Sequence, residues 1–208
     1  MAFAADPSQI TSSPEEVIHP LWVRVTHWIN VVAVLLMAGS GWQIYNASPL
    51  FSFVFPPSLT LGGWLAGALL WHFAAMWLLA ANGILYLVLG LGTGRLRRKL
   101  TPLRPTDVLA DAKAALTGRL SYDDLYVYNA VQKLFYVGVI LAGILIVLSG
   151  LSIWKPVQLQ TLTTLFGGYE AARYVHFFAM AGIVLFSVIH IVMAFVVPKS
   201  LRAMLVGR

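Results

Sequence analysis

Four histidines lie within long apolar stretches of this 208-residue chain. His27 and His72 occupy two separate stretches, and His176 and His190 share another near the C-terminus. An ionisable side chain inside a membrane segment is costly, so each of these residues marks a candidate functional site. Neutral imidazole is a common metal ligand. Four such rings can supply two axial ligands to each of two irons, so the pattern predicts two bis-histidine sites for haem b.

The interval between His176 and His190 is the most specific part of this pattern. Fourteen residues turn an α-helix by about 1400°, which is about 40° short of four full turns. Both imidazoles therefore project from one face of a helix, about 21 Å apart along its axis. This spacing suits two haems stacked along one helix.

The composition indicates which kind of element carries these residues. Apolar residues make up 59% of the chain and charged residues only 11%, and the mean hydropathy is +0.80. These values are typical of an integral membrane protein. A helix needs about 20 apolar residues to cross a hydrocarbon core of about 30 Å. Four stretches are long enough: Leu21 to Tyr45, Trp64 to Leu91, Val127 to Trp154, and Ala172 to Val197. We therefore expect an all-α protein with one transmembrane four-helix bundle over residues 20–198.

The chain contains no cysteine. This excludes a disulfide, a thiolate-bound iron–sulfur cluster and a c-type haem attached through a C-x-x-C-H motif. Any haem would be held by coordination and packing alone. Residues 1–19 lack a basic start followed by an apolar stretch, so we expect a flexible cytoplasmic tail and no cleaved signal peptide. Residues 199–208 are expected to form a basic cytoplasmic tail.

The distribution of basic residues predicts the orientation, because cytoplasmic loops carry an excess of Lys and Arg. Of the 14 basic residues, all but Lys155 and Arg173 fall on one side of the four stretches, many of them in a loop over about residues 92–126. Both termini are therefore expected in the cytoplasm. The net charge of +6 is explained by this topology and does not indicate nucleic-acid binding.

This orientation pairs the histidines by depth. The first and third helices run outward, and the second and fourth run inward. His27 and His190 then lie near the cytoplasmic surface, whereas His72 and His176 lie near the outer surface. The alternative for any single histidine is a hydrogen-bonded core residue or a helix contact, and this is the role expected for His19. For the four others, the match of depths two by two favours haem ligation.

The third helix contains no histidine, so we expect it to form a wall of the site. Small residues would let a helix backbone approach a flat macrocycle, although ordinary helix packing is the alternative. The candidates are Gly39, Gly41, Gly143, Gly150, Ala179 and Gly182.

Two connections carry further signals. In the cytoplasmic loop, Asp107 to Leu116 has helix-like start and stop signals and an apolar face that suits the membrane surface. Ser121 and Asp124 resemble a capping box that would begin the third helix. The outer loop from Asn46 to Ser58 is rich in Phe and Pro, and exposed apolar surface of this kind suggests a partner or the membrane interface.

The Arg24-Val25-Thr26-His27-Trp28 stretch, together with His72, His176 and His190, resembles the bacterial cytochrome b561 and nickel–iron hydrogenase b-type cytochrome superfamily. The resemblance covers residues 20–198. It implies a four-helix membrane protein that binds two b-type haems through these four histidines and passes electrons between a quinone and a partner. Residues 41–46 are similar to those of membrane cytochromes associated with periplasmic molybdopterin oxidoreductases of the sulfite-oxidase or thiosulfate-reductase kind.

The sequence thus predicts an electron-transfer cytochrome of the bacterial inner membrane. Its expected partners are quinone, membrane lipid and a redox protein on the periplasmic face. Arg24 and Arg173 are candidate partners of the haem propionates, with lipid head groups as the alternative. Trp28 is a candidate wall of a quinone site near the cytoplasmic haem, with anchoring at the interface as the alternative. Two rival functions are a stand-alone superoxide oxidase, with Lys155 and Arg173 steering the anion, and a non-redox transporter or assembly factor.

Overall fold

The computed structural model describes residues 18–117 and 128–207, and within these ranges all regular secondary structure is helical. The expected capping box at Ser121 and Asp124 and most of the N-terminal tail lie outside the described residues. In chain order the elements are α1 (Leu21–Ala47), η2 (Pro57–Leu59), α2 (Leu65–Gly92), α3 (Arg95–Leu100), α4 (Pro105–Leu116), α5 (Ala130–Trp154), α6 (Gln160–Leu165), α7 (Tyr169–Val196) and α8 (Pro198–Val206).

Four helices, α1, α2, α5 and α7, are long and apolar enough to cross a membrane. The four predicted spans are confirmed, with ends that differ by three residues at most. At 1.5 Å per residue, the 27 residues of α1 extend about 40 Å, more than a hydrocarbon core requires. All ten prolines of the chain lie outside these four helices, because proline inside a helix removes a hydrogen bond and clashes with the preceding turn.

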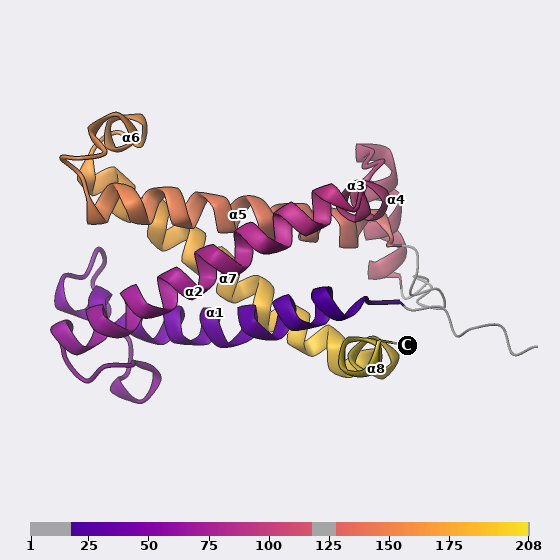
Figure 1. Ribbon diagram of the computed structural model, residues 1–208, viewed down its shortest axis with the longest axis horizontal. Helices are drawn as coiled ribbons and strands as arrows, with labels where there is room; N and C mark the ends of the chain where they lie inside the picture. The colour runs from indigo at the N-terminus through magenta and orange to yellow at the C-terminus, as the bar shows by residue number, and fades with distance from the viewer. Residues whose placement is uncertain (1–17, 118–127, 208) are drawn as a thin grey trace, which may run out of the picture.

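The four long helices form two closely packed pairs. α1 packs along α2 and α5 packs along α7, whereas the contacts between one pair and the other are sparse. Figure 1 shows the four helices running along the long axis of the molecule. The side chains with least exposure are small, among them Ala33, Ala68, Ser149 and Ala172. Small residues let helix backbones approach closely, which is how membrane helices associate.

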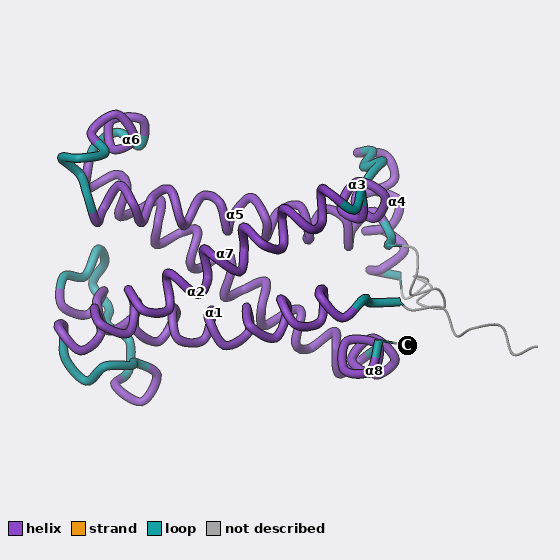
Figure 2. The backbone as a smooth tube through the Cα atoms, viewed as in Figure 1, coloured by secondary structure: helices purple, strands orange, loops and turns teal. Residues whose placement is uncertain are grey.

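The loops and short helices lie at the two ends of the bundle (Figure 2). One end, here called the α6 end, contains α6, η2 and the loop of residues 48–64; the other, the α8 end, contains α3, α4 and α8. Residues 18 and 207 meet at the α8 end, where the Gly207 carbonyl accepts hydrogen bonds from the backbone N–H groups of Ile18 and His19. The segment expected to be a basic tail is thus largely a helix that folds back onto the start of α1.

The beginning of α5 differs from the expectation. Asn129 is its N-cap, and a capping box joins Asn129 to Gln132: each side chain accepts from the other residue's backbone N–H. The Asp111 carboxylate, on the predicted α4 helix, accepts a hydrogen bond from the Ala130 N–H at 2.6 Å. Four unpaired N–H groups begin every helix, and here a neighbouring helix satisfies one of them. The loop helix α4 is therefore tied to the membrane bundle.

The loop of residues 48–64 folds into an aromatic cluster that joins the two helix pairs. Phe51 and Phe53 contact Phe177 of α7 with ring centroids 5.3 and 6.3 Å apart, and Tyr45 of α1 contacts Phe177 at 5.3 Å. Asn46 fixes the loop by exchanging two hydrogen bonds of 2.8 Å with the backbone of Phe55. Much of the apolar surface expected for a partner is thus used within the protein, although Phe51 and Phe53 remain 38% and 46% exposed.

The contact between His19 and Arg95 gives a prediction about pH. The Arg95 guanidinium, which can only donate, lies 3.3 Å from Nδ1 of His19. Burial, and then the charges of Arg95 and Lys99, lower the pKa of His19 from 6.5 to about 4. As the pH falls from about 6.5 to 4, the unfolded chain takes up a proton that the folded protein does not, so stability should fall in this window.

The measurement is the free energy of unfolding in detergent as a function of pH. His19→Gln, whose amide oxygen can still accept from Arg95, should lose less stability between pH 6.5 and 4 than the native protein. Equal losses in the two proteins would show that His19 does not cause the pH dependence.

Candidate functional site

The structure brings the four membrane histidines together in two pairs. The ring centroids of His27 and His190 are 6.0 Å apart, and those of His72 and His176 are 6.4 Å apart. His27 and His190 lie toward the α8 end, and His72 and His176 toward the α6 end. Each pair takes one residue from the α1/α2 helix pair and one from the α5/α7 pair. These are the pairs that the depth argument predicts.

The donor set fits an iron that is already held by a macrocycle. The described residues contain no group of three or more His, Cys, Asp and Glu side chains that could hold a metal ion. Imidazole nitrogens bind first-row metals such as zinc at about 2.0–2.1 Å. Two rings on opposite sides of one metal therefore place their ligating nitrogens about 4 Å apart and their centroids about 6 Å apart. The observed centroid distances agree with this, and a porphyrin would supply the four remaining ligands.

Ser40 of α1 fixes the orientation of His72 on α2. Its Oγ lies 3.0 Å from Nδ1 of His72 and donates its own proton to the Leu36 carbonyl at 2.6 Å. Because a hydroxyl has one proton, the Ser40 oxygen must accept from His72. This bond places the ring proton on Nδ1 and leaves the lone pair on Nε2 for a metal.

Ser149 of α5 repeats this arrangement with His176 of α7. Its Oγ lies 3.1 Å from Nδ1 of His176 and donates to the Leu145 carbonyl at 2.8 Å. The Ile146 carbonyl, 3.0 Å from the same nitrogen, is a second acceptor. A metal-bound histidine typically donates its other N–H in this way, which fixes the tautomer and the ring orientation.

A glycine follows each of these serines. A Cβ atom at Gly41 would lie 3.4 Å from Cε1 of His72, and one at Gly150 would lie 3.1 Å from Cε1 of His176. A side chain at Gly150 would crowd the His176 ring, whereas one at Gly41 would be in ordinary van der Waals contact with His72. By contrast, a Cβ atom at Gly143 or Gly182 would meet nothing within 4 Å, so these two expected positions are not close contacts between helices.

Gly41 and Gly150 are among the small residues that the sequence predicts near the site, whereas Ser40 and Ser149 are not among the predicted site residues. Both serines are fully buried. The sequence feature that could have indicated them is a repeated Ser-Gly dipeptide. It occurs once in α1, which contacts His72, and once in α5, which contacts His176. A serine in an apolar helix can satisfy its hydroxyl on its own backbone, and for this reason it did not stand out.

Aromatic side chains flank the pair at the α8 end. Trp28 contacts His27 edge-on with centroids 5.3 Å apart, and Phe186 stacks on His190 at 5.7 Å with an interplanar angle of 11°. The two pairs therefore differ: serine hydroxyls contact the rings at the α6 end, whereas packed aromatic rings surround those at the α8 end. Nearby, the buried Asn82 of α2 donates from Nδ2 to the Thr26 carbonyl at 2.8 Å.

The two predicted propionate arginines connect helices at opposite ends. Arg24 donates to the Leu205 carbonyl of α8 at 2.7 Å. Arg173 donates to the Ser48 carbonyl at the end of α1 and forms a 3.0 Å ion pair with Glu170. These contacts tie each arginine to the protein, while a binding role toward haem or lipid stays a prediction.

Each end also has one buried N–H donor that lacks a hydrogen-bond partner among the described residues. These donors are Nε of Arg24 at the α8 end and Nε1 of Trp42 at the α6 end. A buried donor without a partner is rare and calls for an acceptor. Haem propionates are acceptors of the right kind, so the two orphaned donors fit a haem at each end.

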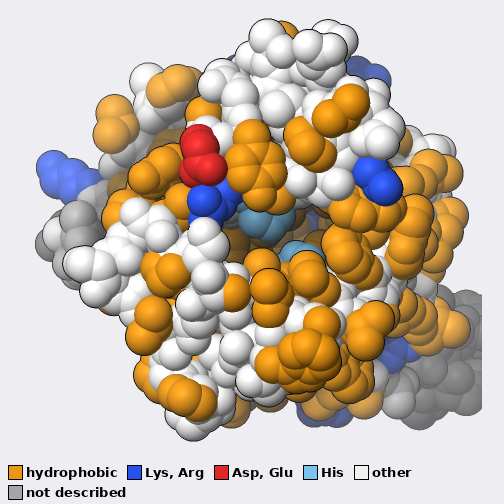
Figure 3. Space-filling model, turned by 90° about the vertical axis from the view of Figure 1, so that its left-hand side faces the viewer, with side chains coloured by type: hydrophobic (Ala, Val, Ile, Leu, Met, Phe, Trp, Pro, Cys, Tyr) orange, Lys and Arg blue, Asp and Glu red, His pale blue; other side chains and the backbone are white. Residues whose placement is uncertain are grey.

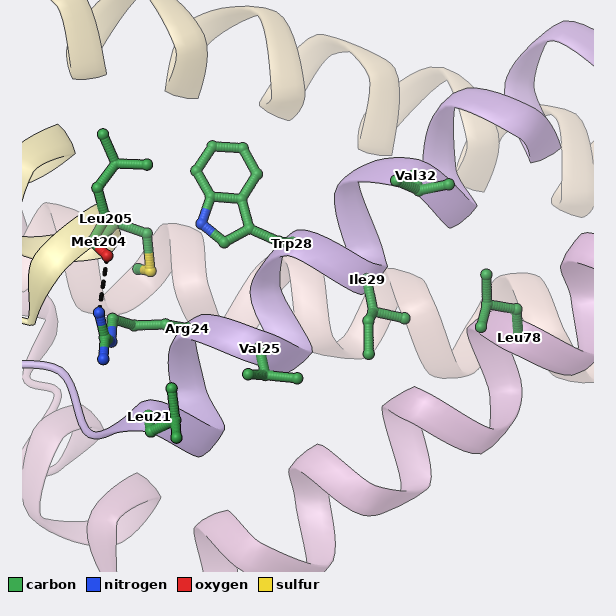
Figure 4. Close-up of a pocket in the computed structure, with 9 residues that line it drawn as sticks. All are labelled: Leu21, Arg24, Val25, Trp28, Ile29, Val32, Leu78, Met204 and Leu205. Carbon is green, nitrogen blue, oxygen red and sulfur yellow. Dashed lines mark hydrogen bonds between the residues drawn. The ribbon is translucent and has the colours of Figure 1, made fainter.

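An open groove of about 550 Å³ lies beside the α8-end pair, between α1, α2 and α8. Figure 4 shows Arg24 and Trp28 of α1 facing Met204 and Leu205 of α8. The other lining residues are apolar. The groove thus combines an apolar slot, an indole that touches His27, and a guanidinium.

The α6 end is hollowed at its centre, and histidine side chains are visible at the bottom of the hollow (Figure 3). Hydrophobic side chains form most of its rim, with acidic and basic groups at one side. The pair His72 and His176 lies toward this end. This end of the bundle therefore gives access to histidine side chains from outside the protein.

Comparison with known proteins agrees with this geometry. A family model described as prokaryotic cytochrome b561 matches residues 18–207. A protein of Azospira oryzae is 54% identical over 190 residues, which cover 91% of this chain and 96% of the relative. That relative is named "Putative protein-methionine-sulfoxide reductase subunit YedZ1". The matched region contains all four membrane helices and all four paired histidines. The chain therefore belongs to the prokaryotic cytochrome b561 family, as its resemblance predicted.

Proposed function

We propose that this cytochrome binds two b-type haems and carries electrons between the quinone pool and a redox protein on the periplasmic face of the bacterial inner membrane. The observation that carries the proposal is the presence of two imidazole pairs, 6.0 and 6.4 Å between centroids, at two depths of one membrane bundle. Haem bound at each pair would cycle between ferric and ferrous iron and so carry one electron at a time.

The protein's own residues have separable roles in this function. His27 with His190, and His72 with His176, would each hold one haem iron. Ser40 orients His72 and leaves its Nε2 free. The surrounding apolar helices exclude water, which lowers the dielectric and contributes to the reduction potential.

The orientation rests on charge. Residues 18 and 207 lie at the same end of the bundle, as four spans require. The α8 end contains α3, α4 and α8, which carry most of the basic residues of the described chain. Since basic loops stay in the cytoplasm, we assign both termini and the pair His27–His190 to the cytoplasmic side.

The relative suggests which partner is served. Its printed name makes it a subunit of a protein-methionine-sulfoxide reductase, and at 54% identity the same kind of partner is the first candidate for this chain. Reduction of a sulfoxide to a thioether consumes two electrons and two protons and releases water. The hollow at the α6 end is the proposed surface at which the partner receives the electrons.

The groove at the α8 end is the proposed quinone site. Its volume of about 550 Å³ is within the range of small-molecule sites, about 300–1,000 Å³, which are mostly apolar with a few placed polar groups. Trp28 can contact the quinone ring, and Arg24 can donate to a carbonyl oxygen. Because Trp28 also contacts His27, a quinone in this groove would lie one side chain away from a proposed iron ligand.

The first test of the proposal counts and assigns the haems. A pyridine haemochrome assay on purified protein should give two non-covalent b haems per chain. His27→Ala and His190→Ala should remove one and the same spectral component, and His72→Ala and His176→Ala the other, because each variant breaks one bis-imidazole pair. A single haem, or a crossed pattern of losses, would contradict the two-site arrangement; a colourless protein would contradict haem binding altogether.

The second test concerns the groove. Trp28→Leu should reduce kcat/KM for oxidation of a quinol analogue about tenfold, which corresponds to about 1.4 kcal/mol, while both haems are retained. Trp71→Leu is the matched control, since Trp71 is also an exposed indole next to a paired histidine, His72, but lies outside the groove. An equal loss in both variants, or none in Trp28→Leu, would place quinone elsewhere.

A further inference from the structure

The two histidine pairs differ in what holds their rings, and this difference has a chemical consequence. At the α6 end, both Nδ1 atoms face a serine oxygen, at 3.0 Å for His72 and 3.1 Å for His176. At the α8 end, the structure gives His27 and His190 aromatic neighbours, and neither ring has a hydrogen bond to the described residues. The serine contacts occur once in each helix pair, from α1 to α2 and from α5 to α7.

The direction of these hydrogen bonds is fixed by the serines themselves. Each hydroxyl donates to the carbonyl four residues earlier in its own helix, at 2.6 Å for Ser40 and 2.8 Å for Ser149. The oxygen is left as an acceptor for the Nδ1–H of the histidine, a role that it shares at His176 with the Ile146 carbonyl. An imidazole that donates this proton becomes a stronger electron donor through its other nitrogen. A stronger donor stabilises ferric iron relative to ferrous iron.

We propose that Ser40 and Ser149 are positioning residues that orient the imidazoles of His72 and His176 and lower the reduction potential of the haem they hold. The proposal rests on the haem ligation put forward above. The two serines act through the histidines, without contact with the iron, and Gly150 leaves room for the His176 ring beside Ser149. The haem at the α8 end has no such contact and is expected to be insensitive to these serines.

The variants Ser40→Ala, Ser149→Ala and the double variant test the proposal. Each removes one buried oxygen and keeps a good helix former. Potentiometric titration of the visible spectrum should show a more positive midpoint for one haem only, the component that disappears in His72→Ala. For the double variant we expect about a tenfold change in the ferric-to-ferrous equilibrium, which for one electron is about 59 mV. The low-spin ferric EPR signal of the same component should shift, and that of the other should not.

Ser187→Ala is the matched control. Ser187 lies on α7, three residues before His190, and its hydroxyl donates to the Ile183 carbonyl at 2.8 Å, which is the same backbone contact that the two other serines make. Because its hydroxyl has no hydrogen bond to an imidazole of the described residues, its loss should leave both potentials unchanged. A shift equal to that of Ser149→Ala would overturn the proposal, since the effect would then come from the helix and not from the ring.

The remaining outcomes are also decisive. If the native protein contains no haem, the proposed function itself fails. If both haems bind and the double variant keeps native potentials and EPR signals, the proposed function stands and the role of the serines is wrong. Selective loss of the α6-end haem in the double variant, with the other retained, supports the positioning role, because the loss of such partners weakens metal binding about 10–100-fold.

Discussion

The structure depends on one constraint: an imidazole in a hydrocarbon environment must satisfy both of its nitrogens. Leaving a polar group unpaired there costs several kcal/mol. For His72 and His176 the proton-bearing nitrogen is satisfied by a serine on the neighbouring helix, so only the lone-pair nitrogen is left. The two rings lie between the helix pairs with their centroids 6.4 Å apart. A metal that accepts both lone pairs would meet this constraint. The ring spacing and the tautomer together therefore indicate a metal site more strongly than either observation alone.

The paired histidines lie between two helix pairs that are held together in different ways along their length and at their ends. Within each pair, small residues bring the helices into close contact, while contacts between the pairs are sparse along their length. The pairs are instead connected at the ends. Arg173 and the aromatic cluster of the outer loop join α1 to α7 at the α6 end, and Arg24 joins α1 to α8 at the other. These end contacts set the separation at which two histidines can share one metal.

The sequence predicted the features that depend on periodicity and depth. The helical interval from His176 to His190, combined with the direction of each span, was sufficient to pair the four histidines. The predicted ends of the four long helices lie within three residues of the observed ends, because proline and polar residues interrupt the apolar stretches. Family membership followed from the same residues.

Other features depend on contacts between distant residues and were not predictable in this way. The short helices α3, α6 and α8 are too short for hydrophobic periodicity to show. The capping box at Asn129 lies eight residues after Ser121, and the hydrogen bond from Ala130 to Asp111 of α4 joins residues 19 positions apart. Arg24 and Arg173 connect helices through hydrogen bonds to the backbone of Leu205 and Ser48. These bonds form only because α8 and the end of α1 lie next to the two arginines. The contacts of Ser40 and Ser149 with the histidines could not be predicted for the same reason, since only the packing of each helix pair shows which side chain each hydroxyl meets.

The two histidine pairs have different surroundings at the two ends of the bundle. Aromatic side chains contact the histidines at the α8 end, and one of them, Trp28, also lines the open groove. Serine hydroxyl groups contact the histidines at the α6 end, which is hollowed at its centre. An apolar approach suits a lipid-soluble electron carrier, and a hollow with charged groups at its rim suits a soluble protein. The two imidazole pairs therefore differ in both access and hydrogen bonding, and this difference suits the proposed transfer of electrons between a quinone and a soluble partner.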